Sequence, residues 1–290
     1  MTNQNHFMNA GITKWDGKIG NSSYTYYGNI FLIDQFFMPQ LKRFTRIWIY
    51  VPSDYDSSTN HYPVLYMHDG QTVFGECRNT DENRLFMDLI LEKLLLDEKM
   101  SGLIVIAIES SDEFRRRDLN PVKVSSTSSE PRIDDYAEFI VSTLKPFIDN
   151  HFRTLPQREH TGIAGFSAGA ACSIYIGLKF QEVFSKIGAF SLTLAKSFYN
   201  TPETITAIFS KRCIMKIYMD VGKKERQGLP EEIREYFVDD FEDALRNFSN
   251  KLRDFGFDQS ELKYYIDENG EHSLTDASRR LPDALSWLYC

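Results

Sequence analysis

A serine between two glycines is the residue of this sequence with the most definite chemistry. Residues 165–169 read Gly-Phe-Ser-Ala-Gly, the pattern G-x-S-x-G. The apolar run before them predicts a strand, and the small apolar residues of 168–180 predict a helix. On such a sharp strand-to-helix turn the Ser167 hydroxyl stands clear of the sheet, and the free N–H of Ala168 faces a developing oxyanion. Ser167 is the candidate nucleophile, and Ala168 is one candidate for an oxyanion hole.

A serine hydroxyl needs a base, and one histidine has the right place in the chain. Where the G-x-S-x-G turn is catalytic, an acid and then a histidine follow the serine. Of the six histidines only His272 follows Ser167, in a turn between a predicted strand over 262–266 and a predicted helix over 275–289. Because ligands bind beyond the carboxyl ends of strands in open α/β sheets, this turn can bring the imidazole to the serine. We expect His272 to be the general base.

Two carboxylates compete for the third role, which is to orient the imidazole and stabilise its cation. Asp220 ends a strand predicted over 214–220, and Glu225 follows three residues beyond Gly222. We favour Glu225 as the acid because it lies on the turn itself, whereas an Asp220 side chain can point into the rim of the sheet. Asp220 stays the alternative, since Glu225 could equally belong to a solvated run of charges.

A second oxyanion donor is expected from the loop after a short strand predicted over 63–67. Gly70 permits a close turn there, and the N–H of Gln71 can then point at the site. Gln71 and Ala168 together would form the oxyanion hole.

A further set of charged residues could bind the substrate. Asp69 lies beside the predicted oxyanion loop, and Arg115 and Arg116 belong to a small basic cluster in an otherwise acidic chain. A guanidinium can anchor a carboxylate or phenolate of a substrate, although a solvated loop face is the alternative.

The spacing of apolar residues predicts the elements that position these side chains. From residue 62 onward short apolar strands alternate with helices, which indicates a mostly parallel central sheet with helices on both faces. Runs over 24–33 and 43–51 alternate apolar and polar residues and predict an antiparallel hairpin at the N-terminal edge of that sheet. The predicted class is α/β.

The chain shows no break that resembles a linker. We expect an N-terminal extension over 1–20 and a single domain over 21–290. The segment before residue 214 leaves room for a small cap helix over 203–210, so no large lid domain is expected.

Composition excludes several classes of function. The chain carries 33 Lys and Arg against 41 Asp and Glu, a formal charge of −8, which argues against nucleic acid as a partner. Apolar runs are short and the N-terminus does not read as a secretory leader, so no membrane partner is expected. The four cysteines are too sparse for a disulfide scaffold and favour a cytoplasmic setting. A small molecule is the expected partner, and a homo-oligomer stays open.

Motifs for metals and cofactors are missing from the sequence. We find no H-E-x-x-H, no G-x-x-x-x-G-K and no G-x-G-x-x-G, and no cysteine pair at metal-ligand spacing. We therefore expect no metal and no cofactor.

Beyond these residues, the chain resembles the esterase D family of α/β hydrolases, over residues 43 to 289. The likeness is carried in the right order by Tyr62–Gln71, Phe152–Thr154, Ile163–Gly169, Asp220–Glu225 and Gly270–His272. The resemblance implies Ser167 as nucleophile, His272 as base, an acid at Glu225, and an oxyanion hole from Gln71 and Ala168. The sequence departs from the family where Ala170 follows Gly169, since relatives often have a second glycine there.

Residues and resemblance together predict a serine carboxylic ester hydrolase that works through an acyl-enzyme. The family includes feruloyl, acetylxylan and siderophore esterases, S-formylglutathione hydrolases and mycolyltransferases, so a small acetyl, short-chain, feruloyl-type or siderophore-like ester is expected without a choice among them. An acyltransferase with the same triad, a serine peptidase, and a binding module with a decayed site are the alternatives. The natural ester and the fate of the acyl-enzyme are left open.

Overall fold

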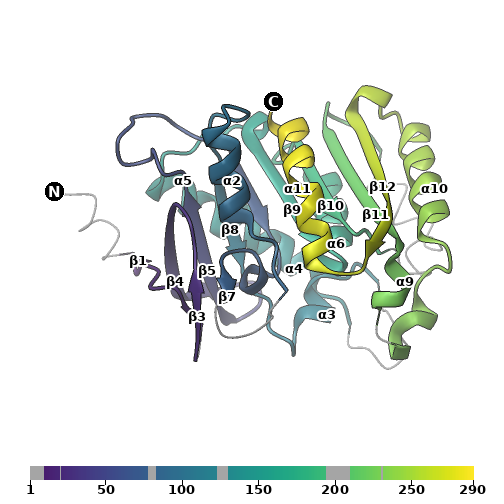
Figure 1. Ribbon diagram of the computed structural model, residues 1–290, viewed down its shortest axis with the longest axis horizontal. Coiled ribbons are helices and arrows are strands. Elements are labelled where there is room, and N and C mark those ends of the chain that lie inside the picture. The colour runs from purple at the N-terminus through teal and green to yellow at the C-terminus, as the bar shows by residue number, and fades with distance from the viewer. Residues whose placement is uncertain (1–9, 20, 78–82, 123–129, 194–209, 230) are drawn as a thin grey trace.

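The computed structural model describes residues 10–19, 21–77, 83–122, 130–193, 210–229 and 231–290 (Figure 1). The cap helix expected over 203–210 falls, apart from Ser210, outside these ranges. Within them, no large lid domain stands over the sheet.

A nine-stranded sheet forms the centre of the molecule. Its strands, in spatial order, are β1 (Thr13–Lys14), β4 (Asn29–Met38), β5 (Arg43–Val51), β8 (Ile104–Ile108), β6 (Val64–Met67), β9 (Thr161–Phe166), β10 (Lys186–Phe190), β11 (Lys216–Lys224) and β12 (Leu262–Glu271). The six strands from β8 to β12 run parallel, whereas β1, β4 and β5 pair antiparallel at one edge. This confirms the predicted parallel sheet with an antiparallel edge.

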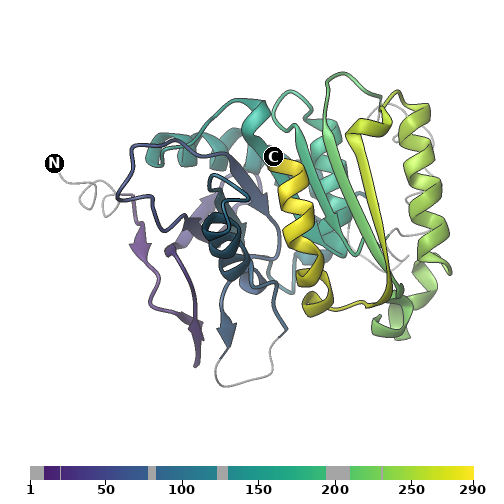
Figure 2. The same cartoon turned by 45° about the horizontal axis from the view of Figure 1, so that its top comes forward.

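Helices cover both faces of the sheet (Figures 1 and 2). They are α2 (Met87–Leu96), α3 (Arg115–Asp118), α4 (Ile133–Glu138) continued by a π-helical turn (Phe139–Leu144) into α5 (Lys145–His151), α6 (Ala168–Lys179), α9 (Glu225–Gly228), α10 (Phe241–Asp254) and α11 (Leu274–Tyr289). Short 3₁₀ turns occupy Gly70–Thr72, Arg158–His160, Glu231–Tyr236 and Gln259–Glu261, and a small second sheet joins β2 (Lys18–Ile19), β3 (Ser22–Thr25) and β7 (Glu76–Cys77).

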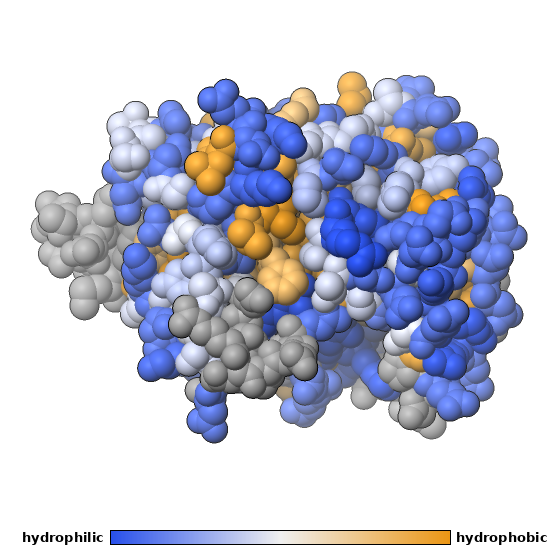
Figure 3. Space-filling view, in the orientation of Figure 1, coloured by the Kyte–Doolittle hydropathy of each residue, from blue (hydrophilic) through white to orange (hydrophobic). Residues whose placement is uncertain are grey.

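Side chains of the central strands feed two separate cores. In β8, Ile104, Ile106 and Ile108 pack on the face covered by α4, α5, α6 and α10, while Val105 and Ala107 pack on the face covered by α2 and α11. Successive strand residues point to opposite faces, so a strand that is covered on both faces has to be apolar throughout. Figure 3 shows apolar side chains near the middle of one face, where α2 and α11 lie side by side, and a mostly polar surface around them.

The antiparallel edge is longer and more irregular than the alternation of residues 24–33 predicts. Gly28 has a positive φ of 70° and separates β3 from β4, and the pairing of β4 with β5 shifts register between Ile33 and Phe36. The bulge interrupts the two-residue alternation, so the second half of β4 is not recognisable by its pattern.

The described part of the segment expected to be an N-terminal extension packs on the domain. Strand β1 pairs with β4, and Ile12 and Trp15 are each only 2% exposed. The Trp15 ring stacks on Tyr26 at 5.1 Å, and its indole N–H donates to the Lys18 carbonyl. Residues 10–19 are therefore part of the packed structure.

None of the described helices combines the length and the apolar character needed to cross a bilayer.

Replacement of Trp15 by alanine tests whether this segment is integral. Because the side chain is buried against two aromatic rings, we expect Trp15→Ala to lower the free energy of unfolding by about 3 kcal/mol. The measurement is urea unfolding followed by circular dichroism. The control is Lys14→Ala on the exposed side of β1, which should change stability by less than about 0.5 kcal/mol. Equal stability of the two variants would show that the segment is detachable.

Candidate functional site

Ser167 lies on a strained turn between β9 and α6. Its backbone angles are φ 59° and ψ −119°, a region that residues other than glycine rarely adopt. The turn is fixed by a hydrogen bond of 2.9 Å from its N–H to the Phe190 carbonyl of β10. A Cβ on Gly165 would lie 2.5 Å from the carbonyl carbon of Gly169. The strand and the helix can therefore approach this closely only because Gly165 lacks a side chain. The result is the sharp bend predicted from G-x-S-x-G.

The Ser167 hydroxyl contacts a residue that sequence analysis did not identify. Its Oγ lies 3.4 Å from Oγ1 of Thr193, which is buried in the loop after β10. Thr193 belongs to no motif. The only available signal is its place beyond the carboxyl end of the strand next to β9.

His272 and Glu225 form a short, shielded hydrogen bond. The imidazole Nδ1–H donates to Glu225 Oε2 across 2.6 Å, and the two side chains are 10% and 0% exposed. The other carboxylate oxygen, Oε1, accepts the Gly222 N–H at 2.8 Å. A glutamate held at both oxygens fixes the plane and the tautomer of the imidazole.

Two short segments bring this pair together. β11 continues to Lys224, so Glu225 opens the one-turn helix α9, and His272 lies between β12 and α11. A Cβ on Gly228, at the end of α9, would lie 2.7 Å from the His272 Cβ. The close approach of α9 to the histidine turn therefore needs a glycine at this position.

Asp220, the alternative acid, makes its hydrogen bonds elsewhere. It is fully buried within β11, where Oδ1 accepts the Ser191 N–H at 2.7 Å and pairs with Arg280 Nη2 at 2.9 Å. Burial raises the pKa of Asp220, the Arg280 guanidinium opposes that rise, and the charge of Glu225 adds to it. Of the two candidates, only Glu225 contacts the imidazole.

The serine turn and the histidine turn lie at the same edge of the sheet. The ring of Phe166, the residue before Ser167, packs on the His272 ring with centroids 4.8 Å apart. The hydroxyl itself contacts Thr193 in this conformation and is not hydrogen bonded to the imidazole. Contacts between a nucleophile and its base are often loose before a substrate binds.

Gln71 lies in the 3₁₀ turn after β6, the strand next to β9. Its side-chain Oε1 accepts the Ser110 N–H at 3.1 Å, and its carbonyl accepts from Arg84. Within the described residues, the backbone N–H groups of Gln71 and Ala168 donate to no group outside their own helical turns. N–H groups at the start of a helix have no intrahelical acceptor, so both are free to bind an anion.

Asp69 and Arg115, two of the candidates for substrate binding, contact each other. The guanidinium donates from Nε and Nη2 to the two carboxylate oxygens at 2.7 and 2.8 Å. Asp69 adopts a left-handed conformation with φ 57°, two residues before Gln71. The pair thus fixes the loop that carries Gln71, and neither charge is left unpaired. Arg116 is exposed on the same short helix, α3.

His68 also lies beside the serine turn, because a Cβ on Gly169 would come within 3.3 Å of the His68 Cβ. It is buried, its Nδ1 lies 3.0 Å from the Tyr136 hydroxyl, and burial lowers its pKa to about 4. His68 is therefore neutral at physiological pH. Among the described residues, no three His, Cys, Asp or Glu side chains are grouped as they would be around a metal ion.

Known proteins share this fold and sequence pattern. The profile of the family described as Putative esterase matches residues 39–288. The uncharacterized protein YbbA of Bacillus subtilis is 24% identical over 255 residues, which cover 86% of this chain and 92% of YbbA.

Two solved structures show the same fold. The ferulic acid esterase AmCE1/Fae1A from Anaeromyces mucronatus superposes with a TM-score of 0.64 at 15% identity, covering 96% of this chain and 94% of that one. The siderophore hydrolase EstB from Aspergillus nidulans superposes with a TM-score of 0.63 at 17% identity, covering 93% and 95%. Because the family profile spans most of the sequence, the chain belongs to the Putative esterase family, and it is an enzyme of the α/β-hydrolase fold that acts on esters.

Proposed function

We propose that Ser167, His272 and Glu225 form a catalytic triad that hydrolyses a small carboxylic ester through an acyl-enzyme. The observation that carries this proposal is the 2.6 Å hydrogen bond between buried Glu225 and His272 at the edge of the sheet where Ser167 occupies its strained turn. A nucleophile, a base and an oriented acid are the three roles that acyl transfer by serine requires.

The chemistry follows from these positions. His272 Nε2 removes the Ser167 proton while Oγ attacks the ester carbonyl carbon, and the Glu225 carboxylate stabilises the imidazolium that forms. The N–H groups of Gln71 and Ala168 hold the oxyanion, each contributing about 3 kcal/mol to the stability of the transition state. The imidazolium then protonates the leaving alcohol, and water, activated by the same imidazole, releases the acid and restores the serine.

The expected substrate is a small carboxylic ester, whose acyl group passes first to Ser167 and then to water. The named activities of two structural neighbours, a ferulic acid esterase and a siderophore hydrolase, support aromatic and siderophore-type esters as the first to be tried. A panel of acetyl, butyryl, feruloyl and thioester substrates would choose among them. Added alcohols would reveal acyl transfer as a new ester product.

Removal of the Ser167 hydroxyl is the first test. We expect Ser167→Ala to lower kcat for p-nitrophenyl acetate by at least about 10⁴-fold, because the other groups cannot form the acyl-enzyme without it. The absorbance of the released p-nitrophenol measures the rate. The control is Ser142→Ala, an exposed serine of the π-helical turn, which should leave the rate unchanged. Undiminished turnover by Ser167→Ala would refute the assignment.

A pair of amide substitutions identifies the acid. Glu225→Gln keeps the shape of the side chain but favours the wrong imidazole tautomer, so we expect kcat to fall by about 10³- to 10⁴-fold. Asp220→Asn, which removes the charge of the alternative acid, should cost less than about tenfold because Asp220 does not contact the imidazole. Steady-state kinetics on the same ester compares them. The reverse order of effects would make Asp220 the acid.

A further inference from the structure

A buried arginine lies directly behind the proposed acid. Arg280, on α11, has a side chain only 3% exposed, and its guanidinium contacts side chains of β11 and β12. Nη2 donates to Asp220 Oδ1 at 2.9 Å and to Ser191 Oγ at 2.8 Å, and it lies 3.9 Å from Glu225 Oε1. Nη1 lies 3.3 Å from Asp267 Oδ2.

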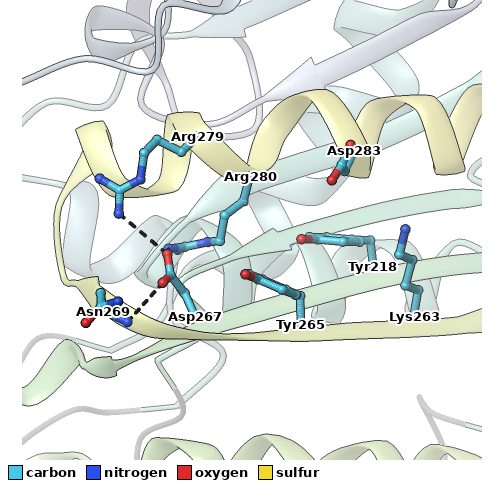
Figure 4. Close-up of a pocket in the computed structure, with 8 residues that line it drawn as sticks. All are labelled: Tyr218, Lys263, Tyr265, Asp267, Asn269, Arg279, Arg280 and Asp283. Carbon is cyan, nitrogen blue, oxygen red and sulfur yellow. Dashed lines mark hydrogen bonds and ion pairs between the residues drawn. The ribbon is translucent and has the colours of Figure 1, made fainter.

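Figure 4 shows this guanidinium beside Asp267 in the wall of a pocket. The volume of the pocket is about 360 Å³. Tyr218, Arg279 and Asp283 also line this pocket. Arg279 also pairs with Asp267, at 3.5 Å, so Asp267 has a second cation beside it.

The buried charges around Arg280 do not balance among themselves. Asp220 and Glu225 are both fully buried carboxylates, and Arg280 is the buried cation between them. An unpaired buried charge is costly, and two buried carboxylates that share a site favour binding of a proton. Burial alone would lower the pKa of Arg280, but Asp220 and Glu225 outweigh burial and raise it, so the cation persists.

We propose that Arg280 is a positioning residue, which neutralises Asp220 and so leaves Glu225 as a carboxylate oriented toward His272. This inference rests on the proposed function of the triad. With Asp220 paired to Arg280, the cluster keeps one negative charge, on Glu225, and that charge is balanced when His272 accepts the serine proton. Without Arg280, two negative charges would face each other, and a proton bound between them would disturb the acceptor that His272 needs.

The groups that can influence this balance come from each packed element. They are Tyr218 and Asp220 of β11, Glu225 of α9, Asp267 of β12, His272 of the β12–α11 turn, and Arg279 and Asp283 of α11 itself.

Arg280→Met, which keeps much of the apolar stem but removes the cation, is the first variant. We expect kcat at pH 7 to fall by roughly 100-fold with KM little changed, because the imidazole loses its orientation before the chemical step. We also expect the acidic limb of the pH profile of kcat/KM to move upward by about one pH unit, the direction set by the loss of a neighbouring positive charge.

Charge compensation separates positioning from a merely structural role. The double variant Arg280→Met/Asp220→Asn removes the cation together with the charge that it neutralises, so it should regain at least about tenfold in kcat over Arg280→Met and return the acidic limb toward that of the wild type. Arg280→Lys should lie between the wild type and Arg280→Met. Asp220→Asn alone leaves Arg280 facing Glu225 only, so its acidic limb should move to lower pH, opposite to Arg280→Met. Coincident pH profiles, or a double variant no faster than Arg280→Met, would overturn the inference.

Folding and the proposed function are checked separately. Thermal unfolding by circular dichroism monitors each variant, and if Arg280→Met does not fold, the opposite shifts expected for Arg280→Lys and Asp220→Asn decide the question.

The low-field proton NMR signal of the His272 Nδ1–H reports the hydrogen bond to Glu225 without any substrate, and it should weaken in Arg280→Met and return in the double variant. If Ser167→Ala retained full esterase activity, the triad itself would fail. If Ser167→Ala were inactive but Arg280→Met had the same NMR signal and the same pH profile as the wild type, only this inference would fail.

Discussion

The site depends on one interaction, the hydrogen bond between a fully buried Glu225 carboxylate and His272. A buried carboxylate is stable only where its oxygens are paired, and here one oxygen takes the imidazole N–H and the other takes the Gly222 N–H. That pairing requires the turns after β11 and β12 to lie next to each other. The parallel sheet meets the requirement because neighbouring strands end at a common edge.

The other groups of the site lie at the same edge of the sheet. The chain passes from β6 to β8 on one side and later to β9 on the other, so the order of strands reverses at β6. In open α/β sheets ligands bind at such a reversal. The strands that meet there, β6 and β9, are followed by the turns that hold Gln71 and Ser167, and each turn has a residue at positive φ, Asp69 and Ser167. The backbone strain of these turns is maintained by the Asp69–Arg115 ion pair and by the hydrogen bond from Ser167 to β10.

Much of this arrangement follows from the sequence, and the remainder depends on long-range contacts. The G-x-S-x-G turn and chain order single out Ser167 and His272, and alternating strands and helices predict the sheet. The sequence predicts that Glu225 lies on a turn, but β11 runs to Lys224, and Glu225 opens a short helix instead. No local pattern links Asp69 to Arg115, 46 residues away, or Arg280 to Asp220, since each pair forms only when the sheet assembles. Thr193 and the register shift in β4 likewise lack a pattern that reveals them.

The central claim, a Ser167 nucleophile activated through His272 and Glu225, is tested most directly by trapping the covalent intermediate. The enzyme is mixed with p-nitrophenyl acetate, quenched in acid within milliseconds and digested, and the peptides are analysed by mass spectrometry. We expect an acetyl group on the peptide that contains Ser167, formed by the wild type and not by His272→Ala. Continued turnover with the acetyl group on another residue, or equal labelling of Ser167 in the two proteins, would contradict the account.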